Sequence, residues 1–334
     1  MAKRSTFRDL LVVVRGTGSI GCRYLRVLRD RLGVRVVAVP TRPARIRELL
    51  EQGVEAVGSV NEIDHSGRVA CIVATDTGRH VSDAIELLHL GDVLIEKPIS
   101  ATTRGLTRLM LSVQTSGRRA YVAHHLRFAA GLAYVRSALP SLGAIDAVRV
   151  VCQSFLPDWR PHRHYRHSYA ARPDEGGVLR DLVHEIDYVG SLLGFPSRVF
   201  AMLRNRARLG IAAEEAADLL WVSPAGASVS VRLDYITRHA RRTLWIGGER
   251  GDLEWDLLAS TGVLHLAGRA AEHSRFPDER DDVIERMLKA FLAGRPEACL
   301  ASLEEGALAV ALLDAARRSS ASGCWESVQD WRQG

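Results

Sequence analysis

A glycine-rich turn near the start of the chain limits the folds open to it more than any other feature. Residues 10–14 form a continuous apolar run, typical of a strand buried on both faces. A helical pattern follows the turn through Leu32, and a second apolar run covers residues 34–39. In this strand–turn–helix setting, a G-x-G-x-x-G turn brings backbone N–H groups close to a pyrophosphate, whereas a bare turn of an unrelated α/β fold is the alternative. The predicted cofactor-binding residues of this turn are Gly16, Thr17, Gly18, Ser19, Ile20 and Gly21.

The end of the second predicted strand bears on which cofactor is bound. Sites that prefer NAD usually place an acidic side chain there, where it holds the ribose 2′-hydroxyl. Residues 39–45 contain no acid, and Thr41 and Arg42 stand at the expected position. They favour a 2′-phosphate, and so NADP(H) over NAD, although a solvent-facing arginine in an arginine-rich chain fits the same pattern.

Strands and helices continue to alternate through the first third of the chain. This repetition predicts a doubly wound parallel sheet of the Rossmann type, which binds ligands at the carboxyl edge of its strands. Further strands are expected at 69–74, 93–95 and 121–124, and further helices at 44–52, 79–90 and 103–116.

Glu96, Lys97 and Pro98 follow directly after one of these predicted strands. Only three of the 45 basic side chains are lysines, at positions 3, 97 and 289. Lysine differs from arginine because its pKa moves readily on burial, as proton transfer requires. A surface lysine before a turn is the simpler reading of these three residues alone, and the rest of the chain decides between the two.

The composition narrows the class of protein. A chain of 334 residues with 47% apolar and 25% charged side chains suits a globular protein of two domains or one large domain. The formal charge of +6 comes from scattered arginines without a basic block, so an anionic small molecule is a better partner than nucleic acid. The five cysteines show no metal-site spacing and fit free thiols in a reducing cytoplasm. No run approaches the ~18 apolar residues of a membrane span. We expect no metal, no membrane anchor and a cytoplasmic location.

The second half reads as short strands followed by two helices. A helical pattern over residues 177–193 places Asp181, His184, Asp187 and Tyr188 on one face. Strands are expected at 147–154, 198–209, 217–222, 227–236, 242–246, 251–257 and 263–267, and the closing helices at 279–293 and 303–319.

Two motifs together resemble the Gfo/Idh/MocA family, named for glucose–fructose oxidoreductase and inositol dehydrogenase. The first is the glycine-rich turn followed by Glu96-Lys97-Pro98, and the second is the Gly-Gly…Asp…His…Asp run over residues 176–187. The resemblance implies a Rossmann domain over residues 1–125. It also implies an α+β domain over residues 126–334 with a large, open, mainly antiparallel sheet, whose closing helix can pack back on the first domain.

The resemblance also implies site residues. It assigns the catalytic roles to Lys97, Asp181 and His184, and it suggests a cis peptide before Pro98. The commonest family motif separates Asp and His by four residues, whereas here they are three apart, so either Asp181 or His184 can be the main base. Thr75, His80 and Glu96 are expected near the cofactor, although His80 is equally suited to starting a helix.

A basic, aromatic loop over residues 154–174 is the most individual part of the chain. Aromatic rings can stack on a sugar ring while arginines bind anionic oxygens, which suits an acidic or nucleotide-linked sugar. A surface loop or a subunit contact is the alternative. The candidate substrate-binding residues in and around this loop are Arg127, Trp159, Arg160, Tyr165, Arg166 and Asp187.

The predicted function is an NAD(P)-dependent sugar dehydrogenase or reductase. The loop resembles that of family members associated with surface-polysaccharide and nonulosonate biosynthesis, and the family implies a homodimer or homotetramer. An inositol or polyol dehydrogenase is an alternative that needs no basic loop. A catalytically silent cofactor-binding sensor or assembly protein is another, although it would need neither Lys97 nor His184.

Overall fold

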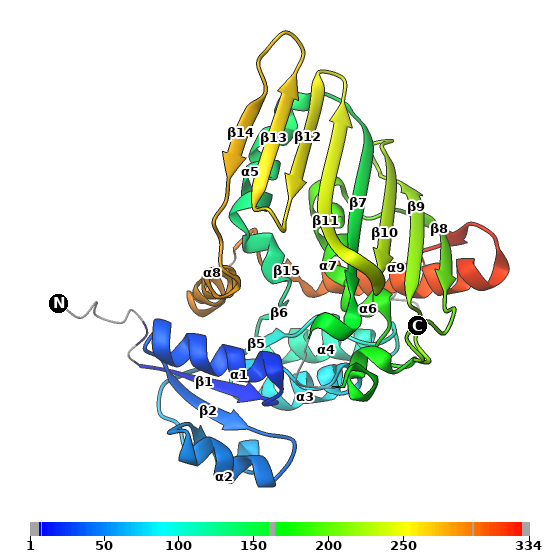
Figure 1. Ribbon diagram of the computed structural model, residues 1–334. Coiled ribbons are helices and arrows are strands. Elements are labelled where there is room, and N and C mark those ends of the chain that lie inside the picture. The colour runs from blue at the N-terminus through cyan, green and yellow to red at the C-terminus, as the bar shows by residue number, and fades with distance from the viewer. Residues whose placement is uncertain (1–6, 8, 160–163, 296, 329–334) are drawn as a thin grey trace.

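The computed structural model describes residues 7, 9–159, 164–295 and 297–328, and it contains two sheets (Figure 1). The first sheet has seven strands in the order β15-β6-β5-β4-β1-β2-β3. Its pairs are parallel except β15 with β6, so the predicted doubly wound parallel sheet is confirmed with one antiparallel edge strand added. The strands are β1 (Leu10–Arg15), β2 (Arg35–Val39), β3 (Glu55–Ala56), β4 (Arg68–Val73), β5 (Asp92–Ile95), β6 (Ala120–Val122) and β15 (Ala301–Ser302).

The register of the central strands creates the edge at which the site lies. Residues 12–14 of β1 are fully buried, because helices cover both faces of the sheet. Arg15 at the end of β1 pairs with Val73 of β4, and Val73 pairs with Ile95 of β5. The carboxyl ends of these three strands therefore meet, and residues 96–98 lie beside the glycine-rich turn.

Helices cover the two faces of the first sheet as two layers. The side chains of α1, α2 and α8 pack on one face, and those of α3, α4 and the first turns of α9 pack on the other. The helix predicted through Leu32 is confirmed in extent, but its second half is π-helical: α1 (Ser19–Arg26) continues as η1 (Val27–Arg31). The other helices of this unit are α2 (Ala44–Glu51), α3 (His80–Leu87) and α4 (Leu106–Ser116).

The second sheet has nine strands in the order β14-β13-β12-β11-β7-β10-β9-β8-β16. All its pairs are antiparallel except β7 with β10, so the large, mainly antiparallel sheet is confirmed. The strand predicted at 198–209 ends at Arg204, and the one predicted at 242–246 is much longer. The strands are β7 (Ile145–Phe155), β8 (Arg198–Arg204), β9 (Ala216–Val222), β10 (Ser228–Asp234), β11 (Ile236–Gly248), β12 (Gly251–Asp256), β13 (Thr261–Leu266), β14 (Glu272–Arg275) and β16 (Glu326–Ser327).

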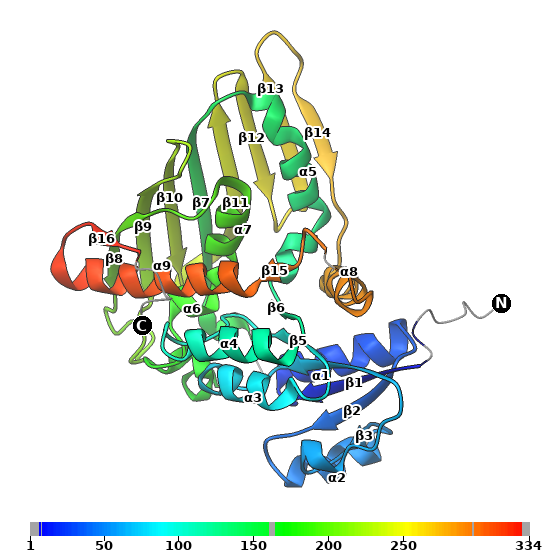
Figure 2. The ribbon, with the colours of Figure 1, turned by 180° about the vertical axis from the view of Figure 1, so that it is seen from behind.

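Helices cover only one face of the second sheet, as Figure 2 shows from behind. The covering helices are α5 (Ala130–Ala138), α7 (Val183–Leu193) and α9 (Leu303–Ser322), and the short α6 (Val178–Asp181) precedes α7. The opposite face carries exposed apolar side chains, among them Met202, Leu220 and Val222. No helix in the described part of the chain combines the length and apolar character that crossing a membrane requires.

The last third of the chain returns to the first sheet. Helix α8 (Arg280–Leu292) adds Ile284, Met287 and Phe291 to the core that contains α1. Helix α9 is shared, because Leu303 and Ala307 lie in the core of the first sheet while later residues of the helix lie in the core of the second. The interior of the Rossmann unit is therefore completed by residues beyond the second sheet.

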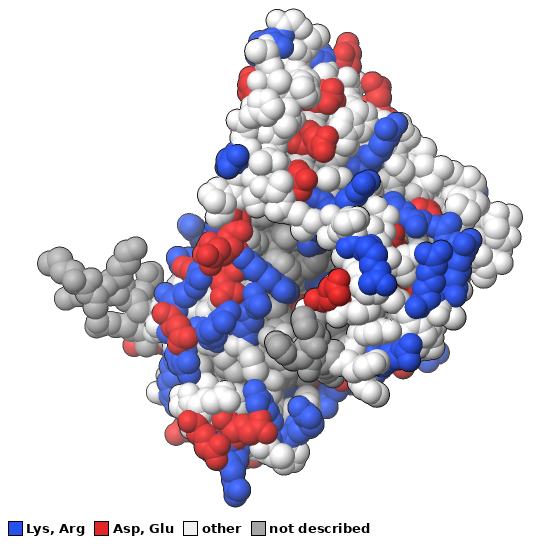
Figure 3. Space-filling view, in the orientation of Figure 1, with Lys and Arg blue, Asp and Glu red and all other residues white. Residues whose placement is uncertain are grey.

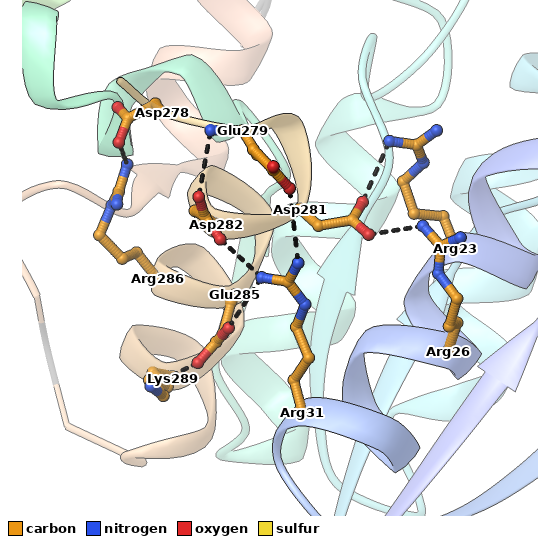
Figure 4. Close-up of polar contacts among 10 residues, drawn as sticks. All are labelled: Arg23, Arg26, Arg31, Asp278, Glu279, Asp281, Asp282, Glu285, Arg286 and Lys289. Atoms are coloured by element: carbon orange, nitrogen blue, oxygen red, sulfur yellow. Dashed lines mark hydrogen bonds and ion pairs between the residues drawn. The ribbon is translucent and has the colours of Figure 1, made fainter. Parts of the chain in front are cut away.

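Ion pairs fasten α8 to α1 and η1, as Figure 4 shows. Arg23 lies 3.1 Å from Asp281, whose other carboxylate oxygen pairs with Arg26. Arg31 pairs with Asp282 at 2.6 Å and with Glu285 at 3.3 Å. These contacts fix the position of α8 beside the helix that follows the glycine-rich turn.

Candidate active site

Lys97 lies at the carboxyl end of β5 and reaches across to the second unit. The predicted cis peptide between Lys97 and Pro98 is present. The side chain of Lys97 is 14% exposed; its Nζ donates to the backbone oxygen of Asp181 at 2.7 Å and lies 3.7 Å from Asp181 Oδ1. A lysine ammonium carries three donors, so this arrangement leaves capacity for one further oxygen.

Two tyrosines hold the carboxylate of Asp181. Tyr169 donates its hydroxyl to Oδ1, and Tyr235 donates to Oδ2 at 2.9 Å. Burial raises the pKa of Tyr235, and the charge of Asp181 adds to this, so Tyr235 stays protonated and donating. None of the hydrogen bonds of Asp181 in the structure goes to His184; its contacts go to Lys97 and the tyrosines.

The helix predicted over residues 177–193 is interrupted, and the interruption changes the directions in which its polar side chains point. Helix α6 ends at Asp181, Leu182 leaves the helical conformation with ψ 28°, and α7 begins at Val183. Asp181 turns toward the two tyrosines, while the ring of His184 packs against His125. The local pattern alone predicts one continuous helix. The structure instead has a break at Leu182, beside the tertiary hydrogen bonds of Asp181 to the two tyrosines.

His184 lies in a cluster of three histidines. Its ring centroid is 4.5 Å from that of His125 and 5.6 Å from that of His124, both in edge-to-face geometry. Burial lowers the pKa of His184 well below its usual value, and its interactions with His125 and Lys97 lower it further. His184 is therefore neutral near pH 7 and can accept a proton. Its Nδ1 has no hydrogen-bond partner among the described residues.

Arg127 and Asp187 bind each other in the interior. Arg127 donates two hydrogen bonds to Asp187, at 2.9 and 2.7 Å, and a third to Glu305. Arg127 is 3% exposed and Asp187 is 1% exposed, and Asp187 lies 3.4 Å from Nδ1 of His124. Both residues were predicted to bind substrate. In the structure their charged groups bind each other beside the histidines, an arrangement suited to holding the histidine cluster in position.

The glycine-rich turn fits a dinucleotide. Gly16 has φ +95°, and a Cβ there would lie 2.5 Å from the backbone oxygen of Ala74. A Cβ on Gly21 would lie 2.0 Å from the oxygen of Gly16, so the turn closes only with glycine at both positions. A Cβ on Gly18 meets nothing within 4 Å, which leaves open space at the N-terminus of α1, where a pyrophosphate would bind.

The remaining predicted cofactor residues are at the same edge. Thr41 and Arg42 follow β2 and are exposed. The Thr75 hydroxyl donates to Asp83 at 2.8 Å, and the ring nitrogens of His80 lie 2.8 Å from Pro98 O and 3.0 Å from Thr75 O. His80 therefore links the ends of β4 and β5 in addition to starting α3.

Glu96 is also engaged within the protein. One carboxylate oxygen accepts from the Tyr24 hydroxyl, and the other accepts from the backbone N–H of Lys97 at 3.0 Å. Tyr24 lies on α1, directly after the glycine-rich turn. Glu96 thereby connects the predicted pyrophosphate-binding helix to the lysine.

The predicted substrate loop packs beside Asp181. Trp159 is 38% exposed, and the edge of its ring meets Tyr235 with centroids 5.4 Å apart. Tyr165 and Arg166 both donate to the backbone oxygen of Leu209. Arg160 lies outside the described residues. A small pocket between this loop and α6 is lined by Leu156, Trp159, Tyr165, Ser168, Tyr169, Ala170 and Asp181.

Sequence reasoning missed several side chains that complete the site. Tyr24 and Tyr235, which hold the two key carboxylates, were not predicted, nor were His124 and His125. Strand alternation places Tyr235 on the same face of the sheet as Leu233, the face toward α6, and this signal was available in the sequence. Within the described ranges, no group of three or more His, Cys, Asp or Glu side chains is arranged to hold a metal ion.

Comparison with known proteins gives two curated relatives. The chain is 28% identical to inositol 2-dehydrogenase 1 of Saccharopolyspora erythraea, over 93% of this chain and 94% of the relative. It is 26% identical to 2,7-anhydro-N-acetylneuraminate hydratase of Mediterraneibacter gnavus, over 76% of this chain and 69% of the relative. Among solved structures, levoglucosan dehydrogenase in complex with NADH superimposes with a TM-score of 0.82 at 18% identity, covering 97% of this chain and all of that one.

Family models match both units of the chain. Residues 10–124 match the model described as the oxidoreductase family with an NAD-binding Rossmann fold, and residues 137–254 match the GFO/IDH/MocA C-terminal domain. Together the two matches span well over half of the sequence, and they agree with the two sheets observed. The chain belongs to the Gfo/Idh/MocA family of oxidoreductases.

Proposed function

We propose that the chain is an NAD(P)-dependent sugar dehydrogenase or reductase in which Lys97 and His184 handle the proton. The observation that carries this proposal is the meeting of Lys97 Nζ with Asp181 at the cofactor edge, beside a buried, neutral histidine. When bound, the nicotinamide cofactor supplies the hydride chemistry. The residues of the chain supply placement and proton transfer.

Each side chain has a distinct part in the proposal. Neutral His184 takes the proton from the reacting hydroxyl, for which a base with a pKa below the operating pH is already in the correct form. Lys97 donates its remaining hydrogen bond to the same oxygen and stabilises the negative charge that develops on it. Asp181, fixed by Tyr169 and Tyr235, holds Lys97 in place. In the reductive direction the same groups return the proton.

Cofactor preference is proposed as NADP(H). Support comes from the absence of an acid at the end of β2 and from the exposed Thr41 and Arg42 there. Replacing Arg42 by Ala should raise the Kd for NADPH, measured by cofactor fluorescence, and leave that for NADH nearly unchanged. An equal effect on both cofactors would remove Arg42 from this role.

An acidic or nucleotide-linked sugar is the proposed substrate class. Support comes from the aromatic side chains beside Asp181 and from a relative named for an acidic sugar, 2,7-anhydro-N-acetylneuraminate. The relative named inositol 2-dehydrogenase 1 favours the second candidate, a polyol. A reducing cytoplasm is the proposed location, because all five cysteines are free thiols.

A homodimer or homotetramer is the proposed assembly. The uncovered face of the second sheet presents Met202, Leu220 and Val222 at 42–54% exposure, and such a patch commonly marks a subunit contact. Replacing Leu220 by Glu should shift the mass measured by light scattering to that of a monomer. A wild-type protein that is already monomeric would contradict the proposal.

The decisive experiment compares wild type, Lys97→Ala and His184→Ala on a panel of acidic sugars, sugar nucleotides and polyols. Lys289→Ala is the matched control, since Lys289 is exposed on α8 and pairs only with Glu285 at 2.6 Å among the described residues. We expect kcat to fall about 10²–10⁴-fold in the two site variants and to be unchanged in the control.

Product analysis should accompany the measurement of kcat by cofactor absorbance. One relative is named as a hydratase, and a net hydration would leave the cofactor absorbance unchanged. Turnover that survives Lys97→Ala would exclude the proposed role of this residue. Tight cofactor binding without turnover on any member of the panel would favour the silent sensor or assembly protein instead.

A further inference from the structure

A second pocket lies on the uncovered face of the second sheet, away from the helices. It has a volume of about 380 Å³ and sits at the ends of β8, β9 and β10 nearest to α6. Arginines gather on this face, on the right of Figure 3. Four of them line the pocket: Arg204, Arg206, Arg208 and Arg232.

The acids of this pocket do not balance its arginines. Asp218 accepts hydrogen bonds from both Arg204 and Arg232, and Arg232 also lies 3.5 Å from Asp234. Arg206 and Arg208 are exposed, and neither guanidinium has an ion-pair or hydrogen-bond partner among the described residues. Two guanidinium groups of the pocket are therefore left without an ion pair or a hydrogen bond within the described part of the chain.

The carboxylate of Glu215 is used to shape the loop that carries these two arginines. Glu215 is 1% exposed and accepts the backbone N–H of Arg206 at 3.1 Å and that of Leu209 at 2.7 Å. It thus orders the backbone, and its bonds do not reach the guanidinium groups.

The same loop is held in a conformation that costs energy. Ala207, between the two arginines, has φ +54°, a region that side chains other than glycine seldom occupy. Asn205 secures it by accepting the N–H of Ala207 at 2.8 Å and by donating to the oxygens of Ile211 and Ala213. Backbone held in this way is found most often at sites of function.

We propose that this pocket binds a phosphoryl anion, through Arg206 and Arg208 with support from Arg204 and Arg232. Guanidinium groups match the oxygens of phosphate in planar, two-bond geometry, and two unpaired arginines match the charge of a phosphate dianion or a diphosphate. The volume exceeds what a single carboxylate would fill. The pre-formed loop reduces the ordering that binding would otherwise require.

The phosphoryl group has two possible sources. The pocket is also lined by Ile236, next to Tyr235, which holds Asp181 on the other side of the sheet. It could therefore receive the phosphate of a nucleotide-linked substrate or a separate phosphate-bearing ligand. Binding can be measured without turnover, so this inference stands or falls independently of the proposed activity.

The test is calorimetric titration of the full-length protein with inorganic phosphate and with pyrophosphate. We expect saturable binding to wild type that weakens roughly tenfold or more for each guanidinium removed, in Arg206→Gln and Arg208→Gln. Arg269→Gln and Arg275→Gln, on exposed arginines of the β13–β14 hairpin, are the matched controls and should bind as wild type does.

Absence of saturable binding to wild type, or equal weakening in the hairpin controls, would overturn the inference. So would dissociation of an oligomer by Arg206→Gln, because the pocket would then hold the carboxylates of a second copy. If the anion belongs to the substrate, Arg206→Gln raises the KM of phosphorylated sugars alone. If it is a separate ligand, phosphate binding persists at saturating substrate; either result supports the site.

Discussion

Three buried histidines make the free energy of unfolding depend on pH. Burial lowers the pKa of His124, His125 and His184 well below the usual value of about 6.5. The unfolded chain takes up protons at these residues as the pH falls from 7 to 5, whereas the folded chain does not until lower pH. Stability is therefore present above the unfolded pKa and is lost below it, on the order of 1 kcal/mol for each histidine.

Chemical denaturation at several pH values checks this expectation. Replacing His124 by Asn should flatten the dependence between pH 7 and pH 5. His89, exposed on the surface, gives the control His89→Asn, which should keep the wild-type slope. A slope that is the same in both variants would show that His124 does not remain neutral in the folded protein.

Tyr235 and Tyr188 form a natural pair for measuring the hydrogen bond to Asp181. Both are fully buried, but only Tyr235 donates to a carboxylate, whereas the Tyr188 hydroxyl has no partner among the described residues. We expect Tyr235→Phe to lower the free energy of unfolding by about 1–3 kcal/mol, and Tyr188→Phe to leave it unchanged or raise it. Thermal denaturation at pH 7 measures both; equal losses would contradict the assignment.

The sequence best predicts those site residues whose type and position can both be recognised within one short segment. Lys97 stands out by its rarity, and its position at a strand end follows from the alternating pattern. The tyrosine partners of Asp181 were missed because Tyr169 and Tyr235 come from different segments and meet Asp181 only through tertiary packing. Strand alternation gives the face of the sheet on which Tyr235 lies, but a single sequence does not show that this face meets Asp181.

At the scale of elements, the glycines of the turn meet two different requirements. One is that the backbone of the turn can close, and the other is that space is left for the cofactor. Gly21→Ala should destabilise the fold, because its Cβ would lie 2.0 Å from the oxygen of Gly16. Gly18→Ala should keep the wild-type Tm, since its Cβ meets no protein atom, but should weaken NADH or NADPH binding by filling the space at the N-terminus of α1. Thermal shift and cofactor fluorescence together distinguish them. A Gly18→Ala protein that binds cofactor normally would place the pyrophosphate elsewhere.

Element boundaries show where sequence pattern stops being informative. Five strands of the first sheet were predicted to within about two residues at each end, because strands buried on both faces are nearly continuous apolar runs. The two-residue strands β3 and β15 were not predicted. The strand expected at 198–209 ends at Arg204, because Asn205 and the buried Glu215 form hydrogen bonds that hold the following residues in a loop. The break at Leu182 likewise depends on contacts distant in sequence.

For the molecule as a whole, shared helices predict cooperative unfolding. Helix α9 contributes to the cores of both sheets, and α8 joins the first core after the second sheet has been completed. We expect a single calorimetric transition, and we expect saturating cofactor to shift all of it, by about 2.7 kcal/mol at about 100 times the Kd. Two resolved transitions, of which cofactor moves only one, would contradict this.

The chain order of these helices has a consequence for synthesis on the ribosome. Side chains of α1 such as Tyr24 and Leu25 emerge early, yet Ile284, Met287 and Phe291, which cover them, are made only after the whole second sheet. During translation the part of this face that α8 covers stays exposed, and an exposed apolar surface promotes aggregation. We therefore expect yields of soluble protein to depend on chaperones that hold the nascent chain until α8 arrives.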